Sequence, residues 1–396
     1  MRETQMSEQP IMVDVESAGF SDEQVLLRDT VRRFAREQVA PRAQAIDAQA
    51  RYPDDMFQAL TALGLFALPF PSAYGGADSI LSACIAVEEL GRICYNTAYL
   101  LIVQWVPFGA ILAGGTDLQR ERWLPELARG DVRAAISVTE PGAGSDVAGI
   151  TTRAERVAGG YLINGAKIFC TNAEVADFVI LAAKTDPAKR HAGISAFVVE
   201  TDRPGIVVGP GEHKLGSRGV PSSPIYLDDC FVPEENRLGA EGAGFGLVME
   251  AFNQSRPIIG ARGVGLAQGA LDLAVDYVRQ RNAFGQRVSD FQGVQWMLAD
   301  MEMKTQAARQ LVYRAARLVD AGLRGKPLAP VVAMAKCFAT DAAMAVATDA
   351  VQLLGCQGIS TDNRIEQYFR DAKVLQIIEG TNQIQRNIVG RALVNQ

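Results

Sequence analysis

The chain has 396 residues, of which 48% are hydrophobic and 21% charged, and its formal net charge is −6. This composition is typical of a globular protein with room for two or three domains. The acidic balance argues against nucleic acids and anionic membranes as partners, and we judge no apolar run long enough to span a bilayer. We therefore expect neither a nucleic-acid nor a membrane partner.

The first region is predicted to be helical. The first 15 residues contain acidic side chains and no apolar core, so they are not expected to be a signal peptide, and we expect residues 1–20 to be a disordered or frayed tail. Ser21-Asp-Glu-Gln24 is a capping box that opens a long amphipathic helix through Ile46. Further helices are predicted over residues 54–64, 78–94, 96–113 and 117–129. Residues 21–130 thus form a predicted N-terminal helical domain.

The texture changes to short β-type runs over residues 131–240. Strands are predicted at residues 135–138, 161–163, 179–183 and 194–199. Gly159-Gly160 and Asn164-Gly165 are predicted turns. No helical segment separates these strands, which favours an antiparallel sheet or barrel over a parallel α/β sheet. We expect a central antiparallel β-barrel-like domain.

Helical periodicity returns from residue 241 to residue 396. Four long segments are separated by breaks near Gly285, residues 325–327 and residues 355–358. We expect a C-terminal four-helix bundle. The predicted fold class is α+β, with a β domain between two helical domains.

Cysteine and histidine usage limits the possible chemistry. None of the six cysteines forms a C-x-x-C pair, which is typical of buried free thiols in a reducing compartment, and we expect a cytoplasmic protein. The two histidines, His191 and His213, are expected at the surface. We predict neither a metal site nor a histidine-based triad.

A carboxylate at a helix break is the first candidate for catalysis. A mostly apolar helical run ends on Glu379, and Gly380 then interrupts the helix. Asn382, with Gln385 three residues later, is a plausible cap for the next helix. Aliphatic neighbours would desolvate the carboxylate and raise its pKa, which suits a general base. A solvated glutamate at a helix end is the alternative.

The second candidate is Thr139-Glu-Pro-Gly-Ala-Gly-Ser-Asp146, which follows the first predicted strand. Glycines at positions 142 and 144 allow a ligand to approach the backbone N–H groups. The third glycine of a dinucleotide fingerprint is missing, since Val147 stands there, and no helix follows. A Rossmann site is excluded, and a plain tight turn is the alternative.

These two segments, with four others in the same order, resemble the acyl-CoA dehydrogenase family of flavoproteins. The others are residues 164–172, 241–245, 279–285 and 352–358, and the resemblance extends from about residue 20 to residue 394. It implies FAD bound between the β domain and the bundle. It also implies α,β-desaturation of an acyl-CoA in fatty-acid β-oxidation, electron transfer to an electron-transfer flavoprotein, and a homo-oligomer, expected to be a tetramer.

The resemblance also implies roles for individual residues toward FAD. Those expected to line the flavin ring are Ile136, Val138, Thr139, Gly144 and Ser145, with Phe169 over one face and Thr171 near N5. Those expected to reach the pyrophosphate and adenosine of a neighbouring subunit's FAD are Arg281, Ala283, Phe284, Gln292, Gln352, Gly355 and Cys356. Thr381, Asn382 and Gln383 are expected to touch FAD as well. Cys356 and Gln367 depart from the small and basic residues usual in the family.

On the substrate side, the resemblance makes Glu379 the base that removes the α-proton. Its backbone N–H and a flavin ribityl hydroxyl would bind the thioester oxygen, and the β-hydride would pass to flavin N5. The residues expected near the thioester or CoA are Ser145, Asn253, Arg256 and Gly380. Some relatives place the base at the position that is Ser255 here. Tyr99 and Leu100 either floor the acyl pocket or pack in the core.

Other functions on the same fold stay open. The substrate could be an acyl-carrier-protein thioester, the reaction could run as an enoyl-thioester reduction, or the protein could be a β-eliminating relative. A non-catalytic flavin- or thioester-binding partner is a further alternative. The carboxylate of Glu379 argues against that alternative, because a binding module needs no base there.

Overall fold

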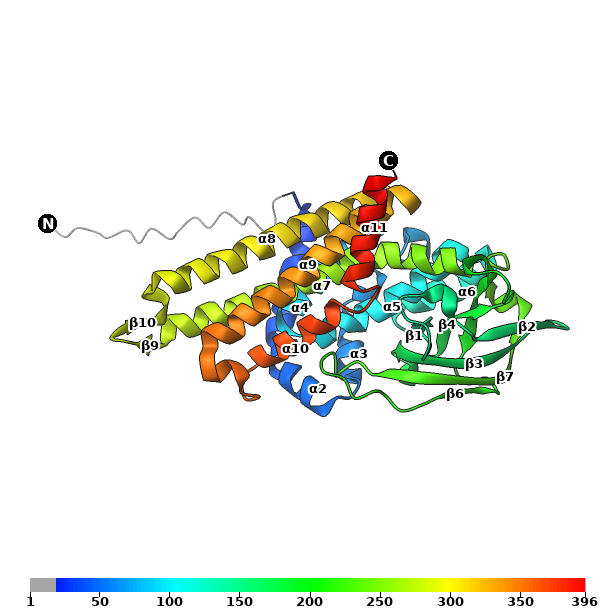
Figure 1. Cartoon of the computed structure of the whole chain (residues 1–396), viewed down its shortest axis with the longest axis horizontal. Helices are drawn as coiled ribbons and strands as arrows, with labels where there is room; N and C mark the ends of the chain where they lie inside the picture. The colour runs from blue at the N-terminus through cyan, green and yellow to red at the C-terminus, as the bar shows by residue number, and fades with distance from the viewer. Residues whose placement is uncertain (1–18, 396) are drawn as a thin grey trace.

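The computed structural model describes residues 19–395. Figure 1 shows the β region at one end of an elongated molecule, a bundle of long helices at the other, and the N-terminal helices along one side between them. The tail expected at residues 1–20 lies outside the described residues, apart from its last two. Of these, Phe20 packs against Tyr313 of the bundle, with ring centroids 5.4 Å apart.

The N-terminal domain is helical, as predicted. Its helices are α1 (Asp22–Phe34), α2 (Ala43–Gln49), α3 (Asp54–Ala62), α4 (Ile80–Ile93), α5 (Tyr95–Gly114) and α6 (Asp117–Arg129). The capping box of Ser21 and Gln24 is confirmed. The single helix expected through Ile46 is wrong, because a π turn and a 3-10 turn separate α1 from α2. Pro41 lies in the second turn and cannot donate a helical hydrogen bond.

The β region forms one open sheet. Its strands are β1 (Ala134–Ser137), β2 (Arg153–Val157), β3 (Gly160–Thr171), β4 (Phe178–Lys184), β5 (Ile194–Glu200), β6 (Ile206–Val208), β7 (Ser222–Pro233) and β8 (Arg237–Leu238). Their order is β6-β7-β3-β2-β4-β5-β8, and β1 also pairs with β4.

The expected antiparallel barrel is therefore wrong in two respects. The sheet is mixed, since β1 and β2 both pair with β4 in parallel. In the chain, β1 and β4 are separated by the antiparallel hairpin of β2 and β3. After this hairpin the chain enters β4 running in the same direction as β1. The sheet also stays open. Closure would require its two edge strands to pair, and β6 and β8 are only three and two residues long.

Strand β3 contains two irregularities. The Gly159-Gly160 turn forms, but Asn164-Gly165 is not a turn. It is a bulge within β3, where the register shifts against β7. Gly165 has φ +150°, and a Cβ there would lie 2.5 Å from the Thr152 hydroxyl oxygen, so only glycine fits. A second register shift lies between Lys167 and Cys170.

The C-terminal region is a helical bundle, and its helices surround α7. They are α7 (Gly244–Gln280), α8 (Gln292–Asp320), α9 (Gly325–Leu354), α10 (Ile365–Leu375) and α11 (Asn382–Val394), and a small hairpin of β9 (Asn282–Ala283) and β10 (Gln286–Arg287) links α7 to α8. The fourth predicted segment is divided into two shorter helices at residues 376–381, and this corner between α10 and α11 contains the break predicted at Gly380. Figure 1 shows α10 and α11 returning from the far end of the bundle toward the sheet.

Three helices are long and apolar enough, by length and composition alone, to cross a membrane. They are Tyr95–Gly114, Gly244–Gln280 and Gly325–Ile359, including the short turn that follows α9. This corrects the expectation that no apolar run is long enough. Within the described structure, 83%, 83% and 61% of their most apolar windows are buried, so much of this apolar surface is satisfied by packing inside the protein.

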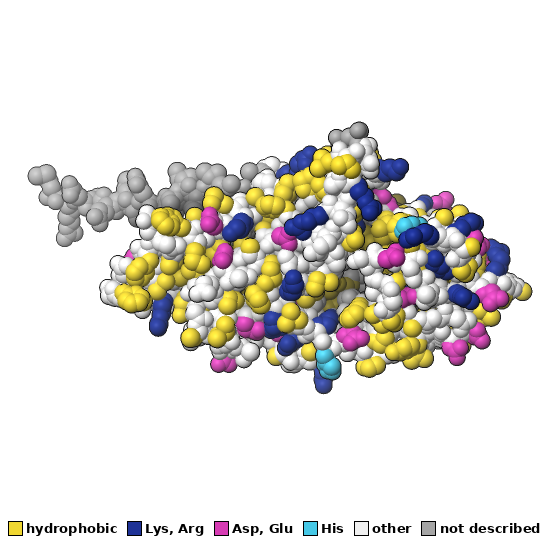
Figure 2. Space-filling view, in the orientation of Figure 1, with side chains coloured by type: hydrophobic (Ala, Val, Ile, Leu, Met, Phe, Trp, Pro, Cys, Tyr) yellow, Lys and Arg dark blue, Asp and Glu magenta, His cyan; other side chains and the backbone are white. Residues whose placement is uncertain are grey.

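The remaining surface is mixed in character. Figure 2 shows charged side chains of both signs scattered over one face, with hydrophobic side chains gathered over parts of the bundle and the sheet. His191 and His213 are exposed, as expected. All six cysteines are free and five are buried, but Cys356 is exposed, contrary to expectation.

Candidate functional site

The proposed base lies at the corner between α10 and α11. Glu379 has φ +56°, a left-handed conformation that is uncommon for a residue with a side chain, and Gly380 follows at φ +86°. The Ser255 hydroxyl on α7 donates a hydrogen bond to Glu379 Oε2 at 2.6 Å. The corner therefore presents the carboxylate to the central helix of the bundle.

The surroundings of Glu379 shift its acidity. Burial raises the pKa of its carboxyl above the ordinary value. The Ser255 hydroxyl opposes this shift, as do the nearby cations Arg256, Arg262 and Lys336. A raised pKa brings a carboxylate closer to the range in which it accepts protons efficiently near neutral pH. By accessible surface the residue is half-buried, so the carboxylate is desolvated in part while Glu379 stays open on one side.

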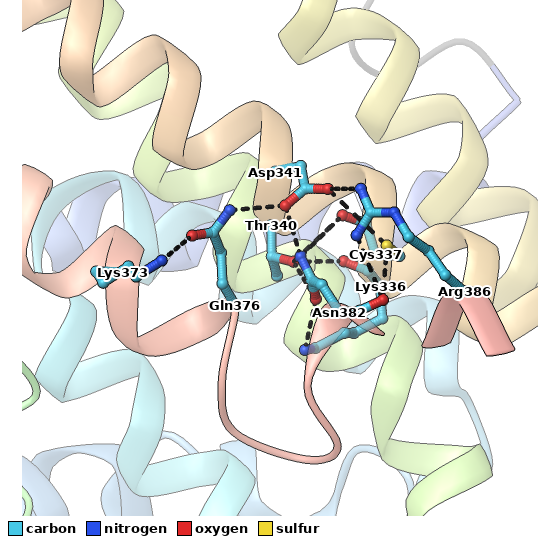
Figure 3. Close-up of polar contacts among 8 residues, drawn as sticks. All are labelled: Lys336, Cys337, Thr340, Asp341, Lys373, Gln376, Asn382 and Arg386. Atoms are coloured by element: carbon cyan, nitrogen blue, oxygen red, sulfur yellow. Dashed lines mark hydrogen bonds and ion pairs between the residues drawn. The ribbon is translucent and has the colours of Figure 1, made fainter. Parts of the chain in front are cut away.

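A polar network that is buried at Lys336 and Asn382 and reaches the surface at Arg386 fixes the corner (Figure 3). Lys336 of α9 donates from Nζ to the Gly380 carbonyl at 3.0 Å and to Asn382 Oδ1 at 2.9 Å. The Asp341 carboxylate accepts hydrogen bonds from side chains on both sides of the corner: Gln376, Asn382 and Arg386. Such a network holds the strained backbone of Glu379 in place.

The network also changes which residue caps α11. The cap expected at Asn382 is wrong: Thr381 is the N-cap, and its hydroxyl accepts the Ile384 N–H at 3.3 Å. Asn382 is instead buried against α9. Gln383 is exposed, and Gln385 donates to the Gly380 carbonyl at 2.9 Å. Of the three residues expected to touch FAD here, Gln383 is exposed and Thr381 half-buried.

A donor for a developing negative charge lies beside the base. Among residues 19–395, nothing accepts a hydrogen bond from the backbone N–H of Glu379. An unpaired N–H at this position suits a carbonyl oxygen of a ligand. On α7, Arg256 Nη1 donates to Asn253 Oδ1 at 2.7 Å, and burial lowers the pKa of Arg256 to about 10, an effect that Glu379 opposes. The structure thus places Arg256 and its partner Asn253 close to the base.

The second wall of the site comes from β3. Phe169 lies in the second β3 irregularity with φ +53°, and its side chain is 55% exposed. The Ile168 N–H donates to the Thr139 carbonyl at 3.0 Å, which joins the 139–146 loop to this strand. Thr171 shares a 2.9 Å hydrogen bond with Ser222. An exposed phenyl ring on strained backbone is expected where a flat ligand stacks.

The 139–146 loop is anchored at one end and open at the other. The Glu140 carboxylate is buried and pairs with Lys167 Nζ at 2.8 Å. By contrast, Gly144 and Ser145 are exposed, and their N–H groups donate to no described residue. Ile136 is half-buried and Val138 packs in a small core cluster. Free N–H groups, the exposed Phe169 ring and the neighbouring hydroxyls fit the expected flavin ring.

Helix α5 closes the space between the two walls. Burial raises the pKa of Tyr99; Arg262 opposes the shift, and Glu379 adds to it. The Tyr99 hydroxyl is also close enough to Thr171 for that side chain to influence it. Tyr99 is therefore near both the base and the β3 wall, and it is also packed in the helical core. Leu100 is fully buried in the helical core.

The structure does not bring the other expected FAD residues to this place. They are Arg281, Phe284, Gln292, Gln352, Gly355 and Cys356, and they lie in or beside the β9–β10 hairpin, at the start of α8 and at the end of α9. Figure 1 shows that hairpin at the end of the bundle remote from the sheet. At 1.5 Å per residue, Ser255 and Arg281 are about 40 Å apart along α7. Within one chain these residues cannot surround the same group as Glu379.

Sequence reasoning missed the residues that hold the corner. Lys336 and Asp341 are the two charged residues within the otherwise uncharged run 328–347. A charge inside a buried apolar helix requires a partner, and that signal was available. The Glu140–Lys167 pair gave no comparable signal, because each residue lies in a mixed polar segment and their contact is formed across the sheet.

Comparisons with known proteins agree with this architecture. Three models match in order: acyl-CoA dehydrogenase N-terminal domain over residues 21–131, middle domain over 135–230 and C-terminal domain over 242–394. The cyclohexane-1-carbonyl-CoA dehydrogenase of Geobacter metallireducens is 43% identical over 95% of this chain and 98% of its own.

Solved structures show the same similarity. Butyryl-CoA dehydrogenase from Megasphaera elsdenii superposes with a TM-score of 0.91 at 36% identity, covering 94% of this chain and 98% of its own. A chain from a study of the electron transferring flavoprotein of Acidaminococcus fermentans gives a TM-score of 0.91 at 38% identity, covering 95% of this chain and 99% of its own.

Proposed function

This chain belongs to the acyl-CoA dehydrogenase family of FAD-dependent oxidoreductases, and we propose that it desaturates an acyl-CoA thioester with Glu379 as the base. The observation that carries the proposal is the carboxylate of Glu379, whose pKa is raised by burial and which lies beside an unpaired N–H. A base and an oxyanion donor on one residue are what removal of an α-proton from a thioester needs.

Each residue of the site has a separate role in the proposed reaction. Glu379 accepts the α-proton on its carboxylate, while its N–H donates to the thioester oxygen and stabilises the developing charge. Ser255 orients the carboxylate through its 2.6 Å hydrogen bond. Phe169, Thr171 and the open N–H groups of the 139–146 loop would hold the flavin. When bound, FAD supplies the acceptor for the β-hydride, which no side chain can provide.

The relatives favour CoA over a carrier protein as the thiol of the substrate. One is named for cyclohexane-1-carbonyl-CoA and another for butyryl-CoA, so both carry CoA thioesters in their names. The similarity to a chain from work on an electron transferring flavoprotein supports such a protein as electron acceptor. A place in β-oxidation agrees with both inferences. The six free thiols support a reducing compartment such as the cytoplasm.

We also propose that the protein is a homo-oligomer, expected to be a tetramer. Arg281 and the other residues expected around the adenosine lie about 40 Å along α7 from the base, so they would serve the FAD of a neighbouring subunit. Phe284 at this end is 96% exposed, which is unusual for a phenyl ring without a partner surface.

The test of the proposed function is a panel of straight-chain acyl-CoAs from C3 to C16, with branched forms. The purified protein is expected to be yellow, and each thioester is mixed with it without oxygen while flavin absorbance is followed. At least one should bleach the flavin rapidly. Protein that stays colourless after incubation with excess FAD, or a flavin that no thioester reduces, would refute the proposal.

The contact between Ser255 and Glu379 gives a prediction for pH dependence. The Ser255 hydroxyl stabilises the charged carboxylate, so Ser255→Ala should raise the pKa of Glu379 further. The acid limb of the kcat/KM profile should then move to higher pH, because a larger fraction of the base is protonated at each pH. The measurement is kcat/KM from pH 5 to 9 for both proteins. An unmoved or lowered limb would show that the contact does not control the base.

A further inference from the structure

Arg262 is a buried cation on the same face of α7 as Ser255. The two residues are seven positions apart, which is two helical turns or about 10 Å. The Arg262 side chain is fully buried. Its guanidinium carbon lies 4.1 Å from the centroid of the Tyr95 ring and 3.8 Å from that of Tyr99, so it packs on two aromatic rings of α5.

This guanidinium lacks the partners that a buried charge normally has. None of its three nitrogens has a described hydrogen-bond partner of good geometry, although the Tyr99 hydroxyl is close enough to interact with it, and no ion pair joins it to a described carboxylate. Contacts with aromatic rings contribute about 2 kcal/mol when desolvated, which is less than the cost of an isolated buried ion. An additional acceptor is therefore expected at this place.

The two nearest acidic groups are already engaged. Glu379 accepts from Ser255, and the buried Asp371 accepts the Ser217 N–H at 2.6 Å. Burial raises the pKa of Asp371 to about 7, so near neutral pH this group does not fully compensate the charge of Arg262. The remaining acceptor has to come from outside the chain.

Two further buried polar atoms lie in this region without partners. They are the Tyr95 and Ser217 hydroxyls, which lie close to each other but make no hydrogen bond of good geometry to a described residue. Burial raises the pKa of Tyr95, and both Arg262 and Ser217 oppose the shift, which places these three groups near one another. Together they offer a cation and two hydroxyls for one acceptor group.

The region is continuous with the proposed site. The Arg262 guanidinium stacks on the ring of Tyr99. Burial raises the pKa of the Tyr99 hydroxyl, the charge of Glu379 adds to this shift, and a hydrogen bond with Thr171 on the β3 wall opposes it. Tyr99 is therefore shared by the surroundings of Glu379 and of Arg262. Ser255, which holds the base, and Arg262 are about 10 Å apart along α7, a span that an acyl group of a few methylenes can cover.

We propose that Arg262, with Tyr95 and Ser217, binds a carboxylate at the far end of the acyl group, so that the substrate is the CoA monothioester of a short dicarboxylic acid. This inference rests on the proposed function. The planar guanidinium matches the two oxygens of a carboxylate, and the pair is stronger in a desolvated pocket than in water. The methyl end of a fatty acyl group would offer no acceptor to the buried guanidinium.

The test compares thioesters of equal length that end in a carboxylate or a methyl group. The pairs are succinyl- with butyryl-CoA, glutaryl- with valeryl-CoA, and adipyl- with hexanoyl-CoA, each assayed for kcat/KM of the holoenzyme. A charged hydrogen bond contributes about 1.5–3 kcal/mol, so the wild type should favour the carboxylate in at least one pair by about 10- to 100-fold.

Two variants separate recognition from a structural role of the cation. Arg262→Met should lose the preference and raise kcat/KM for the methyl-terminated partner, while Arg262→Lys should keep part of the preference because it keeps the charge. Arg33→Met, the same change at an exposed position of α1, should leave the preference as in the wild type. If Arg262→Met does not fold, the proposal is tested by the preference of the wild type within each pair of thioesters and by the part of that preference that Arg262→Lys keeps.

The outcomes distinguish the two proposals. Equal rates within every pair, or a preference for the methyl end, would overturn the carboxylate site and leave the dehydrogenase function intact. A preference that persists in folded Arg262→Met would also overturn it. If no thioester of either kind reduced the flavin, the proposed function itself would fall, together with the inference that rests on it.

Discussion

Replacing Glu379 by Gln is expected to slow the reduction of the bound flavin by an acyl-CoA by a factor of at least about 10² to 10⁴. The amide keeps the shape of the side chain and still accepts the Ser255 hydrogen bond, so FAD and substrate binding should persist. It cannot accept the α-proton. The loss should therefore appear in the rate of reduction, with little change in substrate affinity.

The measurement is anaerobic stopped-flow reduction of wild type and variant with the best thioester of the panel. Glu121→Gln, the same change at an exposed position of α6, is the matched control and should reduce at the wild-type rate. A Glu379→Gln variant that reduced its flavin nearly as fast as the wild type would place the base elsewhere. The reaction would then use another group near Ser255 and Arg256, or would not begin with proton removal.

The helices were predictable from the sequence because their signals are local. The capping box at Ser21 and Gln24 and the break at Gly380 depend on residues within one or two turns of one another. The closure and strand directions of the sheet were not predictable in this way. Alternating side chains indicate a strand, but whether β1 runs parallel to β4 depends on where the hairpin between them folds back.

In the candidate site, too, features that depend on one segment of the sequence were predictable, and features that depend on contacts between distant segments were not. Glu379 was identifiable because an apolar helix ends on a carboxylate followed by glycine, all within one segment. Its supports were not, because Lys336 reaches Gly380 only after α9 packs against the corner. The same holds for Arg262: the sequence shows a charge in an apolar helix, but only the structure shows that the charge has no partner in the described chain.

The second large effect is expected for Lys167→Met, which should lower the free energy of unfolding by about 3–5 kcal/mol. Lys167 and Glu140 form an ion pair of 2.8 Å with side chains almost fully buried. Lys167 also donates to the Val138 carbonyl at 3.1 Å. Removing the cation leaves a buried carboxylate without its partner, which costs more than the pair itself contributes.

The pair also fixes the loop that is expected to hold the flavin. The Glu140 carboxylate accepts hydrogen bonds from the backbone N–H groups of Thr151 and Thr152, so it ties the 139–146 loop to the start of β2. Lys167→Met should therefore weaken FAD binding as well as stability. The measurements are chemical denaturation of the FAD-free protein and titration with FAD. The double variant Lys167→Met with Glu140→Gln should lose less stability than the sum of the losses of the two single variants, because both changes remove the same ion pair.

The pH dependence of stability provides an independent check of the same pair. Burial alone would raise the pKa of Glu140, but the Lys167 ammonium and hydrogen bonds to Thr151 and Thr152 outweigh it and lower the pKa to about 2, against an ordinary value of 4.5. Because the folded-state pKa is the lower one, this stabilisation is fully present above pH 4.5 and is lost as the pH falls toward 2.

The wild type should therefore lose stability between pH 5 and pH 3 more steeply than Lys167→Met, in which the carboxylate has no cation to hold its pKa down. Denaturation curves at pH 7, 5, 4 and 3 measure both slopes, and the other carboxylates contribute equally to the two proteins. The variants should converge as the pH falls, because protonation removes from the wild type what the substitution has already removed. Parallel curves at every pH would show that the Glu140–Lys167 pair is not the source of this stability.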